Sequence, residues 1–170
     1  LLGVLNLTPD SFSDGGKFNT KKRGAYHAIN LINNGADLID VGGESTRPGS
    51  KGISERLEWN RINKVLKLLI KKKIPLSLDT RKSNIMEKGI NQGVRLINDV
   101  SGLDFDVNTI SVLKKYKVPF VIQHAKGLPE NMQKKPNYKN VLLDIYDFFE
   151  DKIKLLRSKG IKHNNIVLDP

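Results

Sequence analysis

The chain has 170 residues, which is enough for one domain with a core of its own. Its hydrophobic fraction of 38% is that of an ordinary globular protein, and no stretch approaches the roughly 20 apolar residues that a membrane-spanning helix needs. The absence of cysteine excludes disulfides and thiolate metal sites. We therefore expect a cytoplasmic protein without a membrane partner.

The net charge of +11 leaves two interpretations open. The basic runs 71–73 and 134–135 could bind an anionic partner, either nucleic acid or a phosphorylated substrate. Alternatively, they are solvated ends of helices in a lysine-rich chain. Aromatic residues are sparse and are not interleaved with the basic runs, so no stacking surface for single strands is indicated. We expect no nucleic-acid partner.

Short apolar segments alternate with helical patterns from one end of the chain to the other. The apolar segments are too short for helices and are apolar on both faces, which is typical of strands buried in a parallel sheet; they span residues 1–5, 38–41, 76–78, 94–97, 118–122 and 166–168. Between them, apolar residues recur at spacings of three and four, which predicts helices: Ala25, Ala28, Ile29 and Ile32; Ile62, Val65, Leu66, Leu69 and Ile70; and Val141, Ile145, Phe148 and Phe149. Gly35 and Gly160 stand where helix C-caps are expected.

This alternation predicts parallel βα units, either in a doubly wound sheet or in a closed barrel. Polar residues at the strand ends favour the barrel, because a barrel gathers its functional groups from many strand ends around one mouth; they are Asn6, Asp40 with Glu44, Asp79, Asn98 with Asp99, His124 and Asp169. We predict a (β/α)8 barrel that is incomplete, with about the first six of its eight strands. It forms a single domain over residues 1–170, truncated at its C-terminal end and slightly at its N-terminal end.

Two loops carry the chemistry-bearing residue types. The first, NLTPDSFSDGG at 6–16, combines turn-formers and hydroxyls with one aromatic residue, and on composition alone it could be a surface turn. The second, GGESTRPG at 42–49, offers backbone N–H groups, hydroxyls and Arg47, a combination suited to gripping an anion. No Walker-A or GxGxxG pattern is present, so neither standard nucleotide-binding loop is indicated.

Taken together, the motifs resemble those of the dihydropteroate synthase family. They occur in the family's order and cover essentially the whole chain: NLTPDSFSDGG, GGESTRPG, SLDT at 77–80, LINDVSG at 96–102, the segment from His124 to Gln133, and VLDP at 167–170. The resemblance implies a (β/α)8 barrel. It also implies a cytoplasmic transferase of folate biosynthesis that joins 6-hydroxymethyl-7,8-dihydropterin diphosphate to p-aminobenzoate, releases pyrophosphate, is a sulfonamide target and forms a homodimer.

The resemblance assigns roles to individual residues. It implies that Asp79, Asn98 and Asp169 hold the pterin ring, with Asp79 also stabilising the positive charge that develops in the reaction. Asn6 matches the loop residue associated with Mg²⁺, and Asp10 is implied as its catalytic helper.

Further matches lie in the two loops and after the fifth predicted strand. Thr46 and Arg47 match residues that contact substrate, and Arg47 would act in catalysis by gripping the diphosphate. Phe12 and Pro48 match apolar positions beside p-aminobenzoate. His124 is expected to form structural hydrogen bonds rather than act as a general base, and Ala125 stands where the family has Met, which thins the packing against the pterin.

Other functions remain open from the sequence. A methyltetrahydrofolate:corrinoid methyltransferase could share the strand-end Asp and Asn residues, but it does not need the two loops at 6–16 and 42–49. A non-catalytic pterin-binding homologue and a basic nucleic-acid-binding module are the remaining alternatives. The family's later Lys, Arg and His residues are not in this chain, so we expect the 170-residue piece alone to be inactive.

Overall fold

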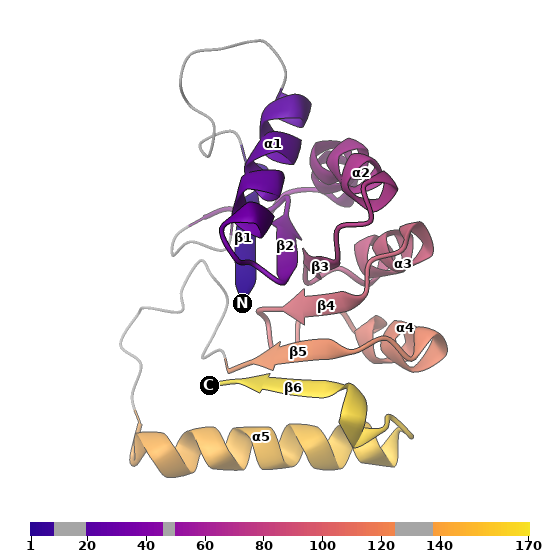
Figure 1. The fold of residues 1–170 in the computed structure, drawn as a ribbon. Helices are drawn as coiled ribbons and strands as arrows, with labels where there is room; N and C mark the ends of the chain where they lie inside the picture. The colour runs from indigo at the N-terminus through magenta and orange to yellow at the C-terminus, as the bar shows by residue number, and fades with distance from the viewer. Residues whose placement is uncertain (9–19, 46–49, 125–137) are drawn as a thin grey trace.

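Six parallel strands form one curved sheet in the computed structural model, which describes residues 1–8, 20–45, 50–124 and 138–170 (Figure 1). The strands are β1 (Leu2–Asn6), β2 (Leu38–Gly42), β3 (Leu76–Asp79), β4 (Leu96–Asp99), β5 (Phe120–Gln123) and β6 (Ile166–Asp169). Each strand pairs with the next one in the sequence, in the order β1-β2-β3-β4-β5-β6. A doubly wound sheet would reverse its strand order, whereas a (β/α)8 barrel does not. The prediction of an incomplete barrel with six strands is confirmed.

The helices lie on the outer side of this sheet (Figure 1). They are α1 (Thr20–Asn33), α2 (Glu55–Lys71), α3 (Ser83–Gln92), α4 (Thr109–Tyr116) and α5 (Val141–Ser158), and a short 3-10 turn, η2 (His163–Asn165), precedes β6. Within the ranges that the structure describes, no helix combines the length and the apolar character needed to cross a bilayer.

The strands end later than the apolar segments predicted. The predicted strand at 76–78 runs on to Asp79, and the one at 94–97 is shifted to 96–99. An apolar run stops at the first polar residue, but the backbone hydrogen bonds of the ladder continue through it. The polar residues therefore belong to the strands themselves, where the backbone fixes their direction.

The core lies between the sheet and the helices. Alternate strand residues such as Leu5, Ile39 and Leu78 are fully buried there, against the predicted stripe of α2. Gly35 and Gly160 adopt the positive φ expected after a helix. The predicted helix at 141–149 is present as part of α5, but its apolar stripe is buried only further along: Val141, the first residue of the helix, is exposed, and Phe149 is buried.

The opposite face of the sheet carries the polar residues. In the parallel register Asn6 pairs with Gly42, Gly42 with Asp79, and Asp79 with Asn98. One layer toward the amino ends, Asp40 pairs with Ser77. Because side chains alternate along a strand, both layers point away from the helices, toward the inside of the barrel.

Gly89 sets the closest approach between α3 and the sheet. A Cβ atom at this position would lie 2.4 Å from Cδ2 of Leu78, whose side chain is fully buried in the core. We predict that Gly89→Ala lowers the free energy of unfolding by about 1–3 kcal/mol, as overpacking does. An exposed helical glycine would instead gain about 1 kcal/mol from the same change.

Denaturant unfolding measures this effect, with Asn91→Ala on the exposed side of α3 as the control. Equal or increased stability of the Gly89→Ala protein would contradict the prediction.

Candidate active site

The carboxyl-end layer of the sheet brings three predicted site residues together. Asn6, Asp79 and Asn98 come from β1, β3 and β4, and the register places them in one row with Gly42. A Cβ atom at Gly42 would lie 3.1 Å from Oδ2 of Asp79 and 3.2 Å from Oδ1 of Asn6. Because Gly42 has no side chain, there is space beside it for the Asp79 and Asn6 oxygen atoms.

Asp40 supports this row from the layer below. Its Oδ2 accepts a hydrogen bond of 2.9 Å from Nδ2 of Asn98, and the side chain is 4% exposed. The sequence marked Asp40 only as a polar residue near a strand end, without a role. Its alternation with Gly42 in LIDVG was the available signal, since residues two apart share a face of the strand.

The electrostatics of the row are set by a high density of carboxylates. Burial raises the pKa of Asp79 well above its usual value, and Asp40, Glu58, Asp99 and Glu44 raise it further through their negative charge. Burial also raises the pKa of Asp40, while the hydrogen bonds with Ser77 and Asn98 oppose the rise. Such a site favours ligands that bring N–H groups or positive charge.

Asp169 lies on the same edge of the sheet but not in the same row. It pairs with Gln123, whose Nε2 donates to Oδ2 of Asp169 over 3.2 Å. In the register of β4 and β5, the partner of Asn98 is Val121, two residues before Gln123. Asp169 is therefore one inward-facing layer further toward the carboxyl ends, and the structure shows no contact between it and Asp79 or Asn98.

His124 is held in an aromatic cluster. Its backbone N–H donates to the carbonyl oxygen of Asp169 over 2.8 Å, and its ring packs edge-on against Phe148 with centroids 5.0 Å apart. Tyr138 lies 6.0 Å from the same ring. These contacts fit the structural part expected of His124, whose role stays a prediction.

The remaining predicted residues fall outside the part of the chain that the structure describes. They are Asp10, Phe12, Thr46, Arg47, Pro48 and Ala125.

A magnesium site would draw on few protein atoms here. Among the described residues there is no group of three or more His, Asp or Glu side chains that could hold a metal ion. The oxygen of Asn6, close to Asp79 across Gly42, is nevertheless a hard ligand of the kind that Mg²⁺ accepts when phosphate and water complete its shell. The residues therefore fit a metal that a substrate helps to bind.

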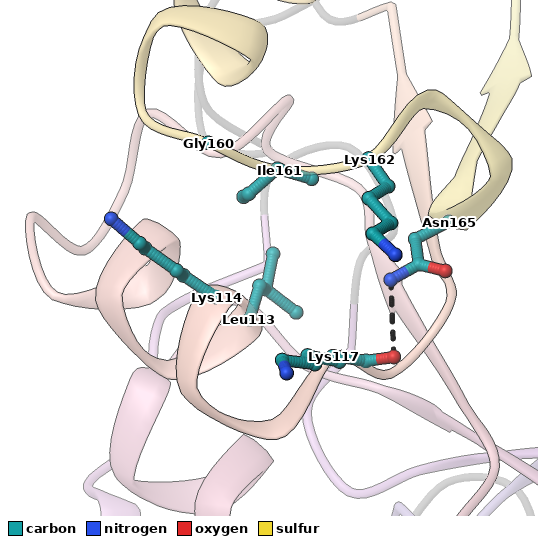
Figure 2. A pocket seen from close by; sticks show the side chains of 7 residues that line it. All are labelled: Leu113, Lys114, Lys117, Gly160, Ile161, Lys162 and Asn165. Atoms are coloured by element: carbon teal, nitrogen blue, oxygen red, sulfur yellow. Dashed lines mark hydrogen bonds between the residues drawn. The ribbon is translucent and has the colours of Figure 1, made fainter.

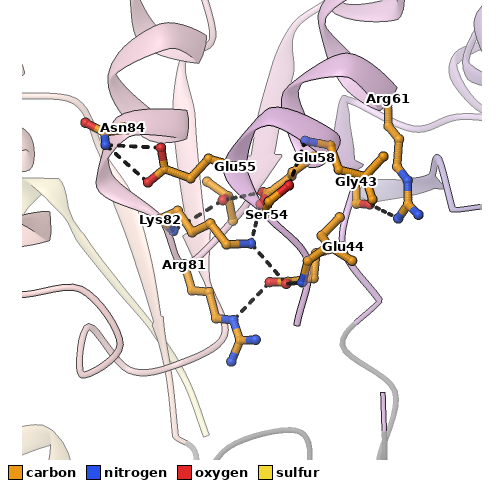
Figure 3. Close-up of polar contacts among 12 residues, drawn as sticks. Gly43, Glu44, Ser54, Glu55, Glu58, Arg61, Arg81, Lys82 and Asn84 are labelled. Carbon is orange, nitrogen blue, oxygen red and sulfur yellow. Dashed lines mark hydrogen bonds and ion pairs between the residues drawn. The ribbon is translucent and has the colours of Figure 1, made fainter. Parts of the chain in front are cut away.

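A buried charge cluster stands behind the row and joins β2, α2 and the start of α3 (Figure 3). Lys82 Nζ lies 2.5 Å from Oε2 of Glu58 and 3.0 Å from Oε1 of Glu44. Arg81 Nε donates to Oε2 of Glu44 over 2.9 Å, and Thr80 donates to Oε1 of Glu58. Two carboxylates thus face two cations away from water.

The cluster also fixes the backbone around the site. Glu44 Oε1 accepts a hydrogen bond of 2.7 Å from the N–H of Ile53. Arg61 donates to the carbonyl oxygen of Gly43 over 2.8 Å (Figure 3). Thr80, Arg81 and Lys82 are the three residues after Asp79, so the same hydrogen bond and ion pairs hold the end of β3. Sequence reasoning missed Glu58 and Lys82, although Glu58 precedes Ile62 by four residues and so shares the buried stripe of α2.

Asp99 does not face the barrel mouth, contrary to the expectation from its place at a strand end. It follows Asn98 directly, so it points to the other face, where it is fully buried. Its Oδ1 accepts from the backbone N–H and hydroxyl of Ser101, at 2.8 and 2.6 Å. Burial raises its pKa to about 6, although these hydrogen bonds oppose the rise.

A cavity of about 330 Å³ lies at the other end of the sheet, between the end of α4 and the start of β6 (Figure 2). Leu113 and Ile161 line it together with three lysines, whose ammonium groups do not converge on a common point in Figure 2. None of the described side chains at the carboxyl ends of the strands lines this cavity. The candidate site is therefore the row at the carboxyl ends.

We predict that Lys82→Met lowers the free energy of unfolding by about 3–5 kcal/mol, because it leaves Glu58 buried without its cation. Chemical denaturation measures the loss. Lys115→Met is the matched control: Lys115 pairs with Glu87 at 2.8 Å on the surface, and its removal should change stability little. Similar losses in the two variants would contradict the importance of the buried pair.

We also predict that Asp99→Asn stabilises the protein at neutral pH. A folded-state pKa of about 6 instead of 3.8 means that the folded protein binds the proton more tightly, so stability falls as pH rises through this window. The ionised carboxylate costs about 3 kcal/mol above it, and Asn avoids that cost while still accepting from Ser101. The difference in unfolding free energy should grow between pH 4 and pH 7; a difference independent of pH would contradict the assignment.

Known proteins resemble this chain in sequence and in fold. A family model described as pterin binding enzyme matches residues 2–170. The dihydropteroate synthases of Clostridium beijerinckii and Bacillus subtilis are 42% and 37% identical over 100% of this chain, which covers 61% and 58% of their lengths. The chain thus spans about three fifths of these curated relatives.

Solved structures agree. The dihydropteroate synthase of Clostridium difficile, determined in the presence of pteroic acid, is 43% identical with a TM-score of 0.90, over 99% of this chain and 62% of that one. That of Yersinia pestis, in complex with a sulfonamide drug, is 39% identical with a TM-score of 0.91, again over 99% and 62%. With its carboxyl-end row of Asn6, Asp79 and Asn98 on a barrel sheet, the chain belongs to the pterin-binding enzyme family.

Proposed function

We propose that the protein containing this chain is a dihydropteroate synthase, a transferase of folate biosynthesis. It would condense 6-hydroxymethyl-7,8-dihydropterin diphosphate with p-aminobenzoate to give 7,8-dihydropteroate and pyrophosphate. The relatives that carry this name match the whole of the chain. Its site residues stand at the carboxyl ends of parallel strands, where barrel enzymes bind their substrates.

The observation that carries the proposal is the donor–acceptor pattern of the row. The Asp79 carboxylate and the side-chain Oδ1 of Asn98 have no hydrogen-bond donors among the described residues, and no cation pairs with Asp79 there. A pterin ring presents an amino group and ring N–H groups along one edge. Acceptors that lack partners within the protein suit such an edge.

The reaction forms one bond and breaks one bond at the pterin methylene carbon. The amine nitrogen of p-aminobenzoate supplies the electron pair for the new C–N bond, and the C–O bond breaks as pyrophosphate leaves with its electron pair. The amine nitrogen then loses a proton. Asp79, facing the ring, would stabilise the positive charge that develops as the C–O bond stretches.

The residues in the two loops complete the proposed site. Arg47 and Thr46 would bind the diphosphate, and Phe12 and Pro48 would wall the p-aminobenzoate subsite. Asn6, with Asp10 as its helper, would hold Mg²⁺ together with phosphate oxygens, and the ion would neutralise charge on the leaving group. Asp169 would bind the pterin from its layer above the row.

The wider properties follow from the same proposal. The substrates are small molecules, and the protein would be a cytoplasmic homodimer and a target of sulfonamides, without a nucleic-acid or membrane partner. Residues 1–170 would form part of a single barrel domain whose further strands complete the active site, so the isolated 170-residue chain would be inactive.

We predict that the full gene product releases pyrophosphate from the pterin diphosphate only when p-aminobenzoate is present, and that Asp79→Asn lowers kcat/KM at least 100-fold. Loss of the carboxylate removes an interaction with developing charge, which typically is worth 10²–10³ in rate. A coupled pyrophosphate assay measures both.

Asp151→Asn, on the exposed side of α5, is the matched control and should retain full activity. A gene product that releases no pyrophosphate would refute the proposed function. Turnover by the isolated 170-residue chain would refute its inactivity.

A further inference from the structure

We propose that Asp40 is a positioning residue that fixes the orientation of the Asn98 amide and thereby makes the site select a ligand edge with an N–H donor. The inference rests on the proposed function, since it concerns how the same site recognises a pteridine. Nothing in the chain's resemblance to its relatives assigned a role to Asp40.

The hydrogen bond between the two side chains decides which end of Asn98 is available. Nδ2 of Asn98 donates to Oδ2 of Asp40 over 2.9 Å. Oδ1 of the same amide has no partner among the described residues and is not among their buried unpaired atoms. It is therefore open to a ligand, to which it can offer only an acceptor.

Asp40 can enforce this orientation because it is held in one place. Its side chain is 4% exposed, and it lies in the middle of β2 between two paired strands. A carboxylate accepts hydrogen bonds and does not donate them, so turning the Asn98 amide over would set its carbonyl oxygen against a carboxylate oxygen. That arrangement loses the hydrogen bond and adds repulsion between two acceptors.

The surroundings of Asp40 support the same conclusion. Ser77, its register partner on β3, also hydrogen-bonds to the Asp40 side chain, so the carboxylate is restrained from β3 as well as by Asn98. On the inner face of β2, Asp40 contacts the site from below while Gly42 leaves space for Asn6 and Asp79 above.

The consequence is a specific discrimination between two ligands. A 2-aminopteridin-4-one presents an amino donor at position 2, whereas pteridine-2,4-dione presents a carbonyl oxygen there. An acceptor pair formed by Asp79 and Asn98 Oδ1 should prefer the first ligand by at least tenfold, because the second sets one acceptor against another. If Asp40 is what fixes Asn98, this preference should depend on Asp40.

The test measures the dissociation constants of both pteridines for the full gene product by ligand fluorescence or calorimetry. The variants are Asp40→Ala, which removes the acceptor, and Asp40→Asn, which keeps the size and lets either end of the Asn98 amide find a partner. Thermal unfolding establishes that each variant is folded. Asp99→Asn is the matched control, because Asp99 is a buried aspartate next to Asn98 that points to the other face.

We expect the ratio of the two dissociation constants to fall by more than threefold in at least one Asp40 variant and to stay unchanged in Asp99→Asn. The inference would be overturned if the ratio of the two dissociation constants in both Asp40 variants stayed within threefold of that of the unsubstituted protein, even with weaker binding overall. Asp40 would then be a purely structural residue. A protein that binds neither pteridine would overturn the proposed function as well.

Discussion

Three parallel strands, β2, β3 and β4, determine where the chemistry of this chain can take place. Their register sets Gly42 beside Asp79 and Asp79 beside Asn98, and it leaves no freedom to exchange these neighbours. A shift of one residue in a strand would turn its inward-facing polar side chain toward the helices. The geometry of the site therefore depends on the packing of the sheet against its helices. The tight contact of Gly89 with Leu78 is part of this packing.

The charges around the row are compensated unevenly. Glu44 and Glu58 share Lys82, and Glu44 also pairs with Arg81, so these two carboxylates are neutralised within the described chain. Asp79 has no cation of its own among the described residues, and its pKa is raised by burial and by the surrounding acids. The buried cations thus neutralise the two carboxylates that hold the backbone. The row keeps a negative potential, which favours a ligand rich in N–H groups.

The sequence predicted this architecture in large part because strand ends are easy to recognise in it. A polar residue closes each short apolar run, and that pattern located Asn6, Asp79 and Asn98 correctly at one edge. It could not separate Asn98 from Asp99, since a run of residues does not say which face each one takes until the strand is placed by its neighbours. Glu58 was missed for a related reason: a charged residue in the first turn of a helix is usually solvated, and only the position of Lys82 on another element makes its burial possible.

Residues on the inner face of β2 shape the site even where they do not contact a ligand. Two of its inward positions are Asp40, an acceptor that holds the Asn98 amide, and Gly42, whose missing side chain admits two neighbouring oxygen atoms. A larger residue at Gly42 would close the approach of Asn6 to Asp79, and a non-polar residue at Asp40 would release Asn98. The row can present acceptors to a ligand because β2 supplies the hydrogen bond that orients Asn98 and the space left by Gly42. Recognition therefore depends on residues that a ligand need not contact.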